Sequence, residues 1–461
     1  MSINSENREI YGKALRLAVP MMIQSGITNA VGLVDNLMVG SLGTESITAV
    51  SIVGQLIFVF NLSIFGGLSG PGIYGAQYYG QGNREGFHNV FRLKVWISIF
   101  ALLAGLLTFS IGGQQLVGLY IHGSDPNIDT ALTMKLAQEY MGIMLWGFVP
   151  FVITQIYAGS LRETGESIKP MVGGIASVVV DVVFNYLLIY GHFGFPKLGV
   201  RGAAIATVLA RIVEMTIVVV WTNIQISKHE FLKGALRTLR IPLFDMKIII
   251  LKSLPIFINE FLWAGGMAAL TQCYSMRGIN IVPGLNISNA ICNLLNVVFV
   301  AMGNAVGILS GQYLGASQFE KAKKYSVKLM WFTGALCLIL TAILLALSGV
   351  FPLLYDTTED VRELGKNFIR INSLFFPVQG FLNALYFTLR SGGKTVITFL
   401  FDSVYTWVVC VVLAFILCSF TSIPILIVFA VIQSMDIIKL LIGYTLIKKG
   451  VWITNLVEEG A

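Results

Sequence analysis

Apolar stretches long enough to cross a membrane recur along this entire chain. A transmembrane helix needs about 20 mostly apolar residues to cross about 30 Å of hydrocarbon. Only 12% of the 461 residues are charged, whereas soluble domains usually contain about 25%. We therefore predict an all-α integral membrane protein with twelve transmembrane helices, at Ala14–Val39, Ser46–Gly70, Val90–Gly112, Leu136–Ala158, Met171–Tyr190, Val200–Thr222, Ile248–Tyr274, Leu285–Leu309, Ser326–Val350, Phe368–Leu389, Val396–Ser419 and Ile423–Ile447.

A basic segment divides the chain near its midpoint. Lys228–Lys247 is rich in lysine and arginine and leaves six predicted spans on either side. We therefore predict an N-terminal lobe at residues 1–227, a cytoplasmic basic linker at 228–247 and a C-terminal lobe at 248–461.

The two halves also share sequence. One offset lays Pro20 on Pro255, and it lays GIYGAQYYG at Gly72–Gly80 on GILSGQYLG at Gly307–Gly315. A similar offset lays SLRETGES on TLRSGGKT. Because each half has an even number of spans, both halves keep the same orientation in the membrane. We expect two pseudo-symmetric six-helix lobes around a central cleft, which is the arrangement of many transporters.

The charges between the spans predict the orientation of the protein. Most of the 31 lysine and arginine residues lie in segments that are on the inner side if the N-terminus is inside. This bias places both termini in the cytoplasm of a multi-pass protein of the cell (inner or plasma) membrane. It also explains the net charge of +7 without a nucleic-acid partner. The first apolar stretch lacks a cleavage-site pattern, so we expect it to remain as a span.

Asp35 lies in the first predicted span, where a charge needs an explanation. An ionised carboxylate at the centre of a membrane costs at least about 2.5–3.5 kcal/mol on insertion scales. Its side chain should therefore face the interior of the bundle or a watery cavity, where it can bind a proton or another cation. The alternative is an aspartate at the headgroup level, because Gly40–Gly43 already resembles a loop.

Three more polar residues lie within the spans of the first half. Asp181 and Asn185 are four residues apart and share one helix face, and Thr207 lies on the next span. Two neighbouring carboxylates in a low-dielectric site titrate as a pair. Together with amide and hydroxyl oxygens they also suit a hard cation. For Thr207, the alternative is a hydrogen bond to a carbonyl of its own helix.

Other charges within spans predict ion pairs rather than binding sites. Arg211 and Glu214 are three residues apart, so we expect them to neutralise each other. The same spacing separates Asp436 from Lys439 in the last span.

Glu260 is the notable acid of the second half, in SLPIFINEFLWAGG. The shared scaffold places Leu270 where the first half has Asp35, and Val409 where it has Asp181. Because the scaffold repeats and the acids do not, we expect the acids to serve function. A lone buried glutamate is a suitable counter-ion for an organic cation, although a pair with Lys252 or a protonated form is the alternative.

Several motifs together resemble the multidrug and toxic compound extrusion (MATE) family of cation-coupled exporters, over nearly the full chain. They are VDNLMVGSLGTESITAVS, GAQYYGQGN with its repeat GQYLGAS, LRETGESIKP, FNYLLIYG, LGVRGAAIATVLAR, LPIFINE and LRSGGKT.

The resemblance implies site residues for transport. It implies a cation site at Asp35, Asp181, Asn185 and Thr207, and a substrate-side acid at Glu260. Some branches of the family carry a second acid where this chain has Gln379. Asp181 stands at a position where asparagine is frequent in the family, and Asn185 stands where either an acid or an amide occurs. The coupling ion can therefore be either a proton or a sodium ion.

We therefore predict a monomeric antiporter that exports amphipathic, mostly cationic small molecules by alternating access. We predict no catalytic residue, no cofactor and no metal site other than sodium at those four residues. The alternative is a flippase for lipid-linked oligosaccharides, which would need an arginine-rich cleft. An intramembrane enzyme would need an Asp-rich metal motif or a His/Asp pair, and the sequence has neither.

Overall fold

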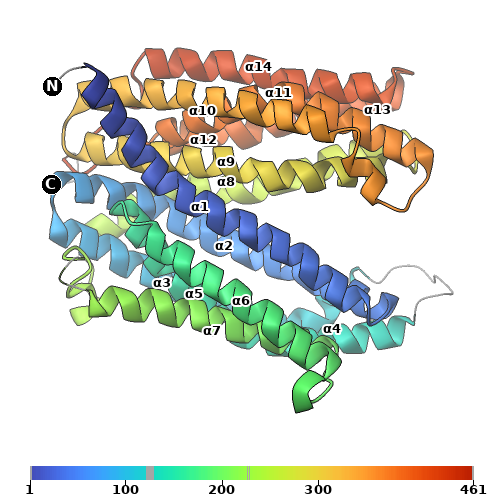
Figure 1. Ribbon diagram of the computed structural model, residues 1–461. Coiled ribbons are helices and arrows are strands. Elements are labelled where there is room, and N and C mark those ends of the chain that lie inside the picture. Colours follow the sequence, from blue (N-terminus) through green and yellow to red (C-terminus); the bar gives the residue numbers. More distant parts are fainter. Residues whose placement is uncertain (1–2, 121–128, 226, 228, 459–461) are drawn as a thin grey trace. The chain divides into compact units, whose positions relative to one another are not determined.

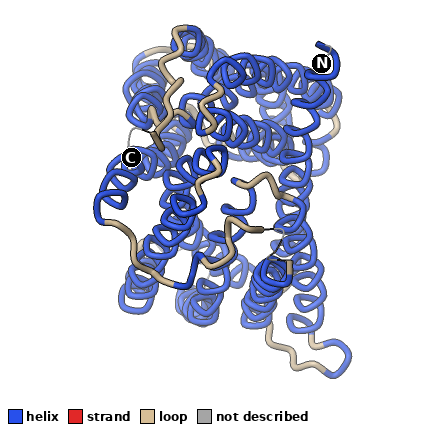
Figure 2. The backbone as a smooth tube through the Cα atoms, turned by 90° about the vertical axis from the view of Figure 1, so that its left-hand side faces the viewer, coloured by secondary structure: helices blue, strands red, loops and turns tan. Residues whose placement is uncertain are grey.

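The computed structural model describes residues 3–120, 129–225, 227 and 229–458. This part of the chain contains helices and loops and no strand (Figure 2). The α-helices are α1 (Ile3–Gly40), α2 (Thr44–Gln81), α3 (Arg84–Gly118), α4 (Thr130–Met144), α5 (Phe148–Glu163), α6 (Ile168–Tyr190), α7 (Val200–Ile224), α8 (Leu243–Ser275), α9 (Ile281–Gly315), α10 (Phe319–Leu347), α11 (Glu359–Ser391), α12 (Thr395–Phe399), α13 (Val412–Phe420) and α14 (Ile425–Lys448) (Figure 1).

The predicted all-α membrane fold is confirmed. Within the described residues, 11 helical segments are long and apolar enough to cross a membrane. The one predicted span that is not among them, Phe368–Leu389, lies inside α11, whose first turns are charged. Many helices extend beyond the predicted spans, because a helix can continue into water after its apolar part ends. The loop charges also predict that the segment His122–Asp129 lies on the outer side of the membrane, but this segment falls almost entirely outside the described residues.

The helices form two compact units. Unit 1 comprises Met1–Met22, Ile73–Asn83 and Phe244–Ala461, and unit 2 comprises Ile23–Gly72 and Arg84–Leu243. The start of α1 and the end of α2 therefore pack with the second half of the chain. The functional division into lobes at 1–227 and 248–461 stays a prediction.

In unit 2, α7 packs against α4, α5 and α6 (Figure 1). The predicted span Leu136–Ala158 is interrupted there by a 3-10 turn at Leu145–Gly147. Pro150 follows this turn closely, and proline cannot donate the backbone hydrogen bond that a regular helix requires.

In unit 1, α11 is the central helix and packs against α9, α10 and α14. A buried cluster joins residues of α1, α9, α10 and α11 to Trp452, which follows α14 and is fully buried. Gln77, from the GAQYYG motif, holds this C-terminal segment. Its Nε2 donates to the Ser391 carbonyl at 2.8 Å, and its Oε1 accepts from the Leu456 amide at 2.8 Å.

The two glycine motifs cross within unit 1. A Cβ atom at Gly80 would collide with the backbone of Gln312, and one at Gly315 would collide with the backbone of Gln77. The motifs GAQYYG and GQYLG therefore pack against each other through equivalent residues. Glycine is required at this crossing because the two backbones approach too closely for any side chain.

Helix ends support the predicted internal repeat. The sequence offset that aligns the glycine motifs also lays the start of α3 at Arg84 on the start of α10 at Phe319. The offset of the LRETG and LRSGG motifs lays the end of α5 at Glu163 on the end of α11 at Ser391. The equivalent of α6 is the segment Thr395–Phe420, which differs by two π-helical stretches, Leu400–Val404 and Thr406–Val411.

Candidate functional site

The four predicted coupling residues lie together in unit 2. α1 supplies Asp35, α6 supplies Asp181 and Asn185, and α7 supplies Thr207. The Asn185 Nδ2 donates to the Asp35 Oδ1 at 2.9 Å. The Asp181 carboxyl lies near the Asp35 carboxyl and the Thr207 hydroxyl. Packing of α1, α6 and α7 thus assembles side chains that are far apart in the sequence.

This cluster has an excess of hydrogen-bond acceptors. Asp181 and Asn185 are 8% and 2% exposed, and the Oδ1 atoms of both are buried without a hydrogen-bond partner in the described part of the chain. The Thr207 hydroxyl donates to the Ala203 carbonyl at 3.1 Å, so its oxygen also remains an acceptor. A buried acceptor without a partner costs about 1–3 kcal/mol. A proton or a hard cation would supply the missing interaction.

Tyr140 and Arg211 border the cluster. The buried Tyr140, on α4, lies near Asp181, Thr207 and Arg211. The Arg211 Nη1 donates to the Gly147 carbonyl at 3.3 Å, at the 3-10 turn between α4 and α5. Sequence reasoning did not assign Tyr140 to the site, although a tyrosine within a predicted span needs a partner for its hydroxyl.

The expected Arg211–Glu214 ion pair does not form directly among the described residues. The Glu214 Oε1 instead accepts from the Gln24 Nε2 at 3.3 Å, and the Gln24 Oε1 accepts from the Arg162 Nη2 at 3.1 Å. The expected pair separates because Arg211 reaches the α4–α5 turn, whereas Glu214 reaches α1. Each still lies within the electrostatic influence of the other.

Sequence reasoning missed a buried ion pair in unit 2. The Lys94 Nζ lies 2.5 Å from the Glu163 Oε1, and it also lies 3.1 Å from the Ser160 Oγ. Both charged side chains are less than one-tenth exposed. The pair joins α3 to the end of α5, within the LRETG motif.

In unit 1, Glu260 is paired with an arginine. The Glu260 Oε1 lies 3.7 Å from the Arg390 Nη1, and the two side chains are 14% and 5% exposed. The Arg390 guanidinium also lies over the Phe387 ring at 5.5 Å. Glu260 is thus not the lone glutamate that the sequence suggested, and Lys252, its expected alternative partner, is exposed. Half-buried Gln379 lies on α11, and within the described residues no hydrogen bond or ion pair joins it to Glu260.

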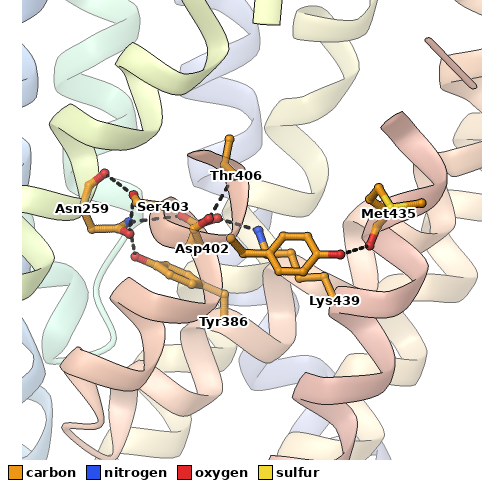
Figure 3. A network of polar contacts seen from close by, with 8 residues as sticks. Asn259, Tyr386, Asp402, Ser403, Thr406, Met435 and Lys439 are labelled. Atoms are coloured by element: carbon orange, nitrogen blue, oxygen red, sulfur yellow. Dashed lines mark hydrogen bonds and ion pairs between the residues drawn. The ribbon is translucent and has the colours of Figure 1, made fainter. Parts of the chain in front are cut away.

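Asn259, next to Glu260, organises a polar network (Figure 3). Its Nδ2 lies 3.1 Å from the Asp402 Oδ2 and 3.2 Å from the Tyr386 hydroxyl. Its Oδ1 accepts from the Ser403 hydroxyl at 2.7 Å. Asp402 and Ser403 belong to the first π-helical stretch. This network connects α8 to α11 and to the segment between α12 and α13.

Lys439 completes the network. Its Nζ lies 2.7 Å from the Asp402 Oδ1 (Figure 3). The expected partner, Asp436, is one turn away on α14 and contributes to the electrostatic environment of Lys439 without forming the close contact. Sequence reasoning missed Asp402, although an acid at the start of the predicted span Val396–Ser419 was a signal.

Acids, amides and basic groups are thus gathered between helices that are apolar enough to cross a membrane. The helix count, the internal repeat and these buried polar clusters define a multi-pass membrane transport protein. Sequence comparison is consistent with this class, because the MatE family profile matches residues 20–187 and 255–420, which is most of the chain. The chain belongs to the MatE family, the transporters whose motifs the sequence resembles.

Relatives cover nearly the whole chain. It is 25% identical over 414 residues to the probable multidrug resistance protein YoeA of Bacillus subtilis, covering 88% of this chain and 87% of that protein. It is 24% identical over 424 residues to the probable multidrug resistance protein NorM of Thermotoga maritima, covering 91% and 88%.

Solved structures share the fold. An outward-facing multidrug resistance MATE family transporter of the MOP superfamily has a TM-score of 0.81 at 20% identity, covering 95% of this chain and 96% of that chain. A MATE crystal structure in the bent conformation has a TM-score of 0.82 at 20% identity, covering 96% and 97%.

Proposed function

We propose that this protein is a cation-coupled antiporter that exports amphipathic, mostly cationic organic compounds by alternating access. The observation that carries this proposal is the acceptor-rich cluster of Asp35, Asp181, Asn185 and Thr207 inside unit 2. We place the protein in the cell (inner or plasma) membrane with both termini in the cytoplasm, as the loop charges indicate. We propose that it works as a monomer.

The cluster suits a coupling site for physical reasons. Its two carboxylates lie together, that of Asp181 buried and that of Asp35 half-buried, so both are stable as anions only if a cation lies between them. A proton or a sodium ion would meet this requirement, and the unpartnered Oδ1 atoms of Asp181 and Asn185 would then gain a ligand. One charge crossing a potential of about 100 mV releases about 2.3 kcal/mol, which corresponds to a roughly 50-fold gradient of substrate.

Glu260 is the proposed contact for a cationic substrate. At 3.7 Å its pairing with Arg390 is longer than a close ion pair, so an organic ammonium group can compete for the carboxylate. Gln379, on α11, offers an uncharged polar contact. The relatives' names, with multidrug resistance in both, support a substrate class of varied organic compounds.

The decisive experiment is transport by the purified protein in proteoliposomes with separately imposed proton and sodium gradients. We expect uphill movement of a fluorescent organic cation under one of the two gradients, with none when both are dissipated. Movement that follows neither gradient would refute cation coupling, and no movement of any organic cation under either gradient would refute the proposed substrate class.

The flippase alternative lacks support in the arrangement of the arginines. Arg390 is paired with Glu260, and Arg211 is held by the Gly147 carbonyl and the Phe151 ring. Neither therefore offers a free guanidinium to a lipid diphosphate. A flippase assay with a fluorescent lipid-linked oligosaccharide in the same proteoliposomes tests this alternative directly.

A further inference from the structure

Lys439 occupies a site with the features of a receptor for an ammonium ion. Its Nζ lies 2.7 Å from an oxygen of Asp402 and 5.4 Å from the centre of the Phe401 ring. The carboxylate of Asp436 adds a second negative charge nearby. A carboxylate beside an aromatic face is a common protein environment for a ligand ammonium group. Here the ammonium group belongs to the chain itself.

The internal repeat shows that the fold does not require this pair. α7 begins at Val200 and α14 at Ile425. Counted from these starts, Lys439 takes the place of Glu214, and Asp436 takes the place of Arg211. At both positions, a residue of one sign of charge in unit 2 is thus replaced by a residue of the opposite sign in unit 1.

The carboxylate partner also differs between the units. Counted from the arginines of LRETG and LRSGG, Asp402 takes the place of Gly174. In unit 2, the space beside Gly174 is filled by Gln24, whose Nε2 would lie 2.6 Å from a Cβ atom at this glycine. In unit 1 the equivalent amide, Asn259, hydrogen-bonds Asp402. The same scaffold thus exists without a carboxylate at this position.

The backbone at Asp402 is also specialised. Asp402 lies in the π-helical stretch Leu400–Val404, whereas its counterpart α6 is a regular α-helix. The Thr406 hydroxyl donates to the Asp402 carbonyl at 2.9 Å, which supports the altered turn (Figure 3). Single π turns inside helices are frequent at functional sites. Asp402 therefore differs from its counterpart Gly174 both in its carboxylate and in the π-helical backbone that carries it.

We propose that Asp402, Asp436 and the Phe401 ring form a binding site for a monovalent cation or a small alkylammonium ion, which Lys439 fills as a tethered cation. This proposal rests on the proposed function. It gives Lys439 the role of keeping free cations out of unit 1, so that the coupling ion is exchanged only at the cluster around Asp35. Lys439 is a positioning and specificity residue, and removing its ammonium group opens the site.

The test uses purified full-length protein carrying Asp35→Asn, so that cations at the proposed coupling site do not contribute. In this background, Lys439→Met keeps the volume of the lysine stem and removes the charge. Lys439→Arg is the control that keeps a tethered cation. The double variant Lys439→Met with Asp402→Asn removes the receiving carboxylate. The melting temperature of each is measured while methylammonium or sodium chloride replaces N-methylglucamine chloride at constant ionic strength.

We expect Lys439→Met to melt lower than its parent in N-methylglucamine and to regain stability as methylammonium or sodium is added. The apparent affinity for the added cation should be at least about tenfold higher than in the parent, Lys439→Arg or the double variant, since one lost charge contact is typically worth that factor or more. A melting temperature of Lys439→Met that does not respond to either cation would overturn the proposal.

A second variant covers the case in which Lys439→Met does not fold. Lys439→Gln can still donate a hydrogen bond to Asp402 and should show the same cation response. If neither variant can be recovered with methylammonium or sodium present throughout purification, while the double variant folds, the carboxylate does not accept a free cation and the proposal is wrong. The gradient assay in proteoliposomes of the unmodified protein tests the proposed function separately.

Discussion

The carboxylate of Glu260 and the guanidinium of Arg390 lie 3.7 Å apart in unit 1, with both side chains largely buried. The two residues belong to α8 and α11, and Arg390 lies in the motif LRSGGKT. In unit 2, the equivalent motif LRETG supplies Arg162, which is held by Gln24 of α1. Each half of the sequence therefore uses this motif to bind a polar residue of the first helix of that half, α1 or α8.

Replacing Glu260 should separate its two roles. In Glu260→Gln, we expect the affinity for cationic substrates to fall by about tenfold or more, which corresponds to about 1.4 kcal/mol or more. Neutral analogues of similar shape should bind almost as before, because they need no counter-ion. Direct binding measurements on the purified protein check this. Equal losses for both kinds of ligand would indicate that Glu260 serves only to hold Arg390.

The spans were predictable because backbone groups in hydrocarbon must be satisfied within a helix, so apolar length is a strong signal. The proximity of Asp35 and Asp181 could be predicted from the sequence for a related reason, since a buried acid needs partners. The ion-pair partners of the other buried charges could not be predicted from their spacing in the sequence. Glu260 pairs with Arg390 rather than Lys252, because helix packing decides which faces meet.

The glycine crossing should be intolerant of a methyl group. Gly315→Ala would press its Cβ atom into the backbone of Gln77, which cannot move as a flexible side chain can. We expect a loss of stability of about 1–3 kcal/mol, measured as a lower melting temperature in detergent. Gly12→Ala in α1 is the matched control, because no atom lies within 4 Å of a Cβ atom there. A similar melting temperature for both variants would contradict the observed close approach.

The Lys94–Glu163 pair should be required as a pair. In Lys94→Met, the carboxylate of Glu163 remains buried without its cation, and we expect a loss of about 3–5 kcal/mol. The double variant Lys94→Met with Glu163→Gln removes both charges and should recover much of this loss. Reversible unfolding in mixed micelles measures both. A double variant that is as unstable as the sum of its single variants would show that the two charges do not interact.

The orientation can be tested at two exposed loop positions. The five native cysteines are buried, so they are replaced first to give a cysteine-free background. A membrane-impermeant maleimide added to intact cells should label Asp356→Cys but not Arg237→Cys, because the loop charges place the basic linker in the cytoplasm. Both positions should react after the cells are permeabilised. Labelling of Arg237→Cys in intact cells would reverse the predicted topology.

Asp35→Asn should uncouple transport from the ion gradient. A carboxylate in the first span is expensive to bury as an anion, so it should be neutralised by a proton or a bound cation in one state of the cycle. The asparagine imitates that neutral state permanently, while the hydrogen bond from Asn185 at 2.9 Å can pass to its amide oxygen. We therefore expect the variant to insert, fold and bind substrate but to lose gradient-driven uphill transport in proteoliposomes.

Asp181→Asn is the matched control for this prediction. Asp181 lies in the same cluster, and the resemblance to the MATE family implies that an amide is compatible with its position, so we expect a smaller loss of transport. Substrate binding by both purified variants distinguishes a coupling defect from misfolding. Uphill transport by Asp35→Asn at the rate of the unmodified protein would show that the coupling ion binds elsewhere.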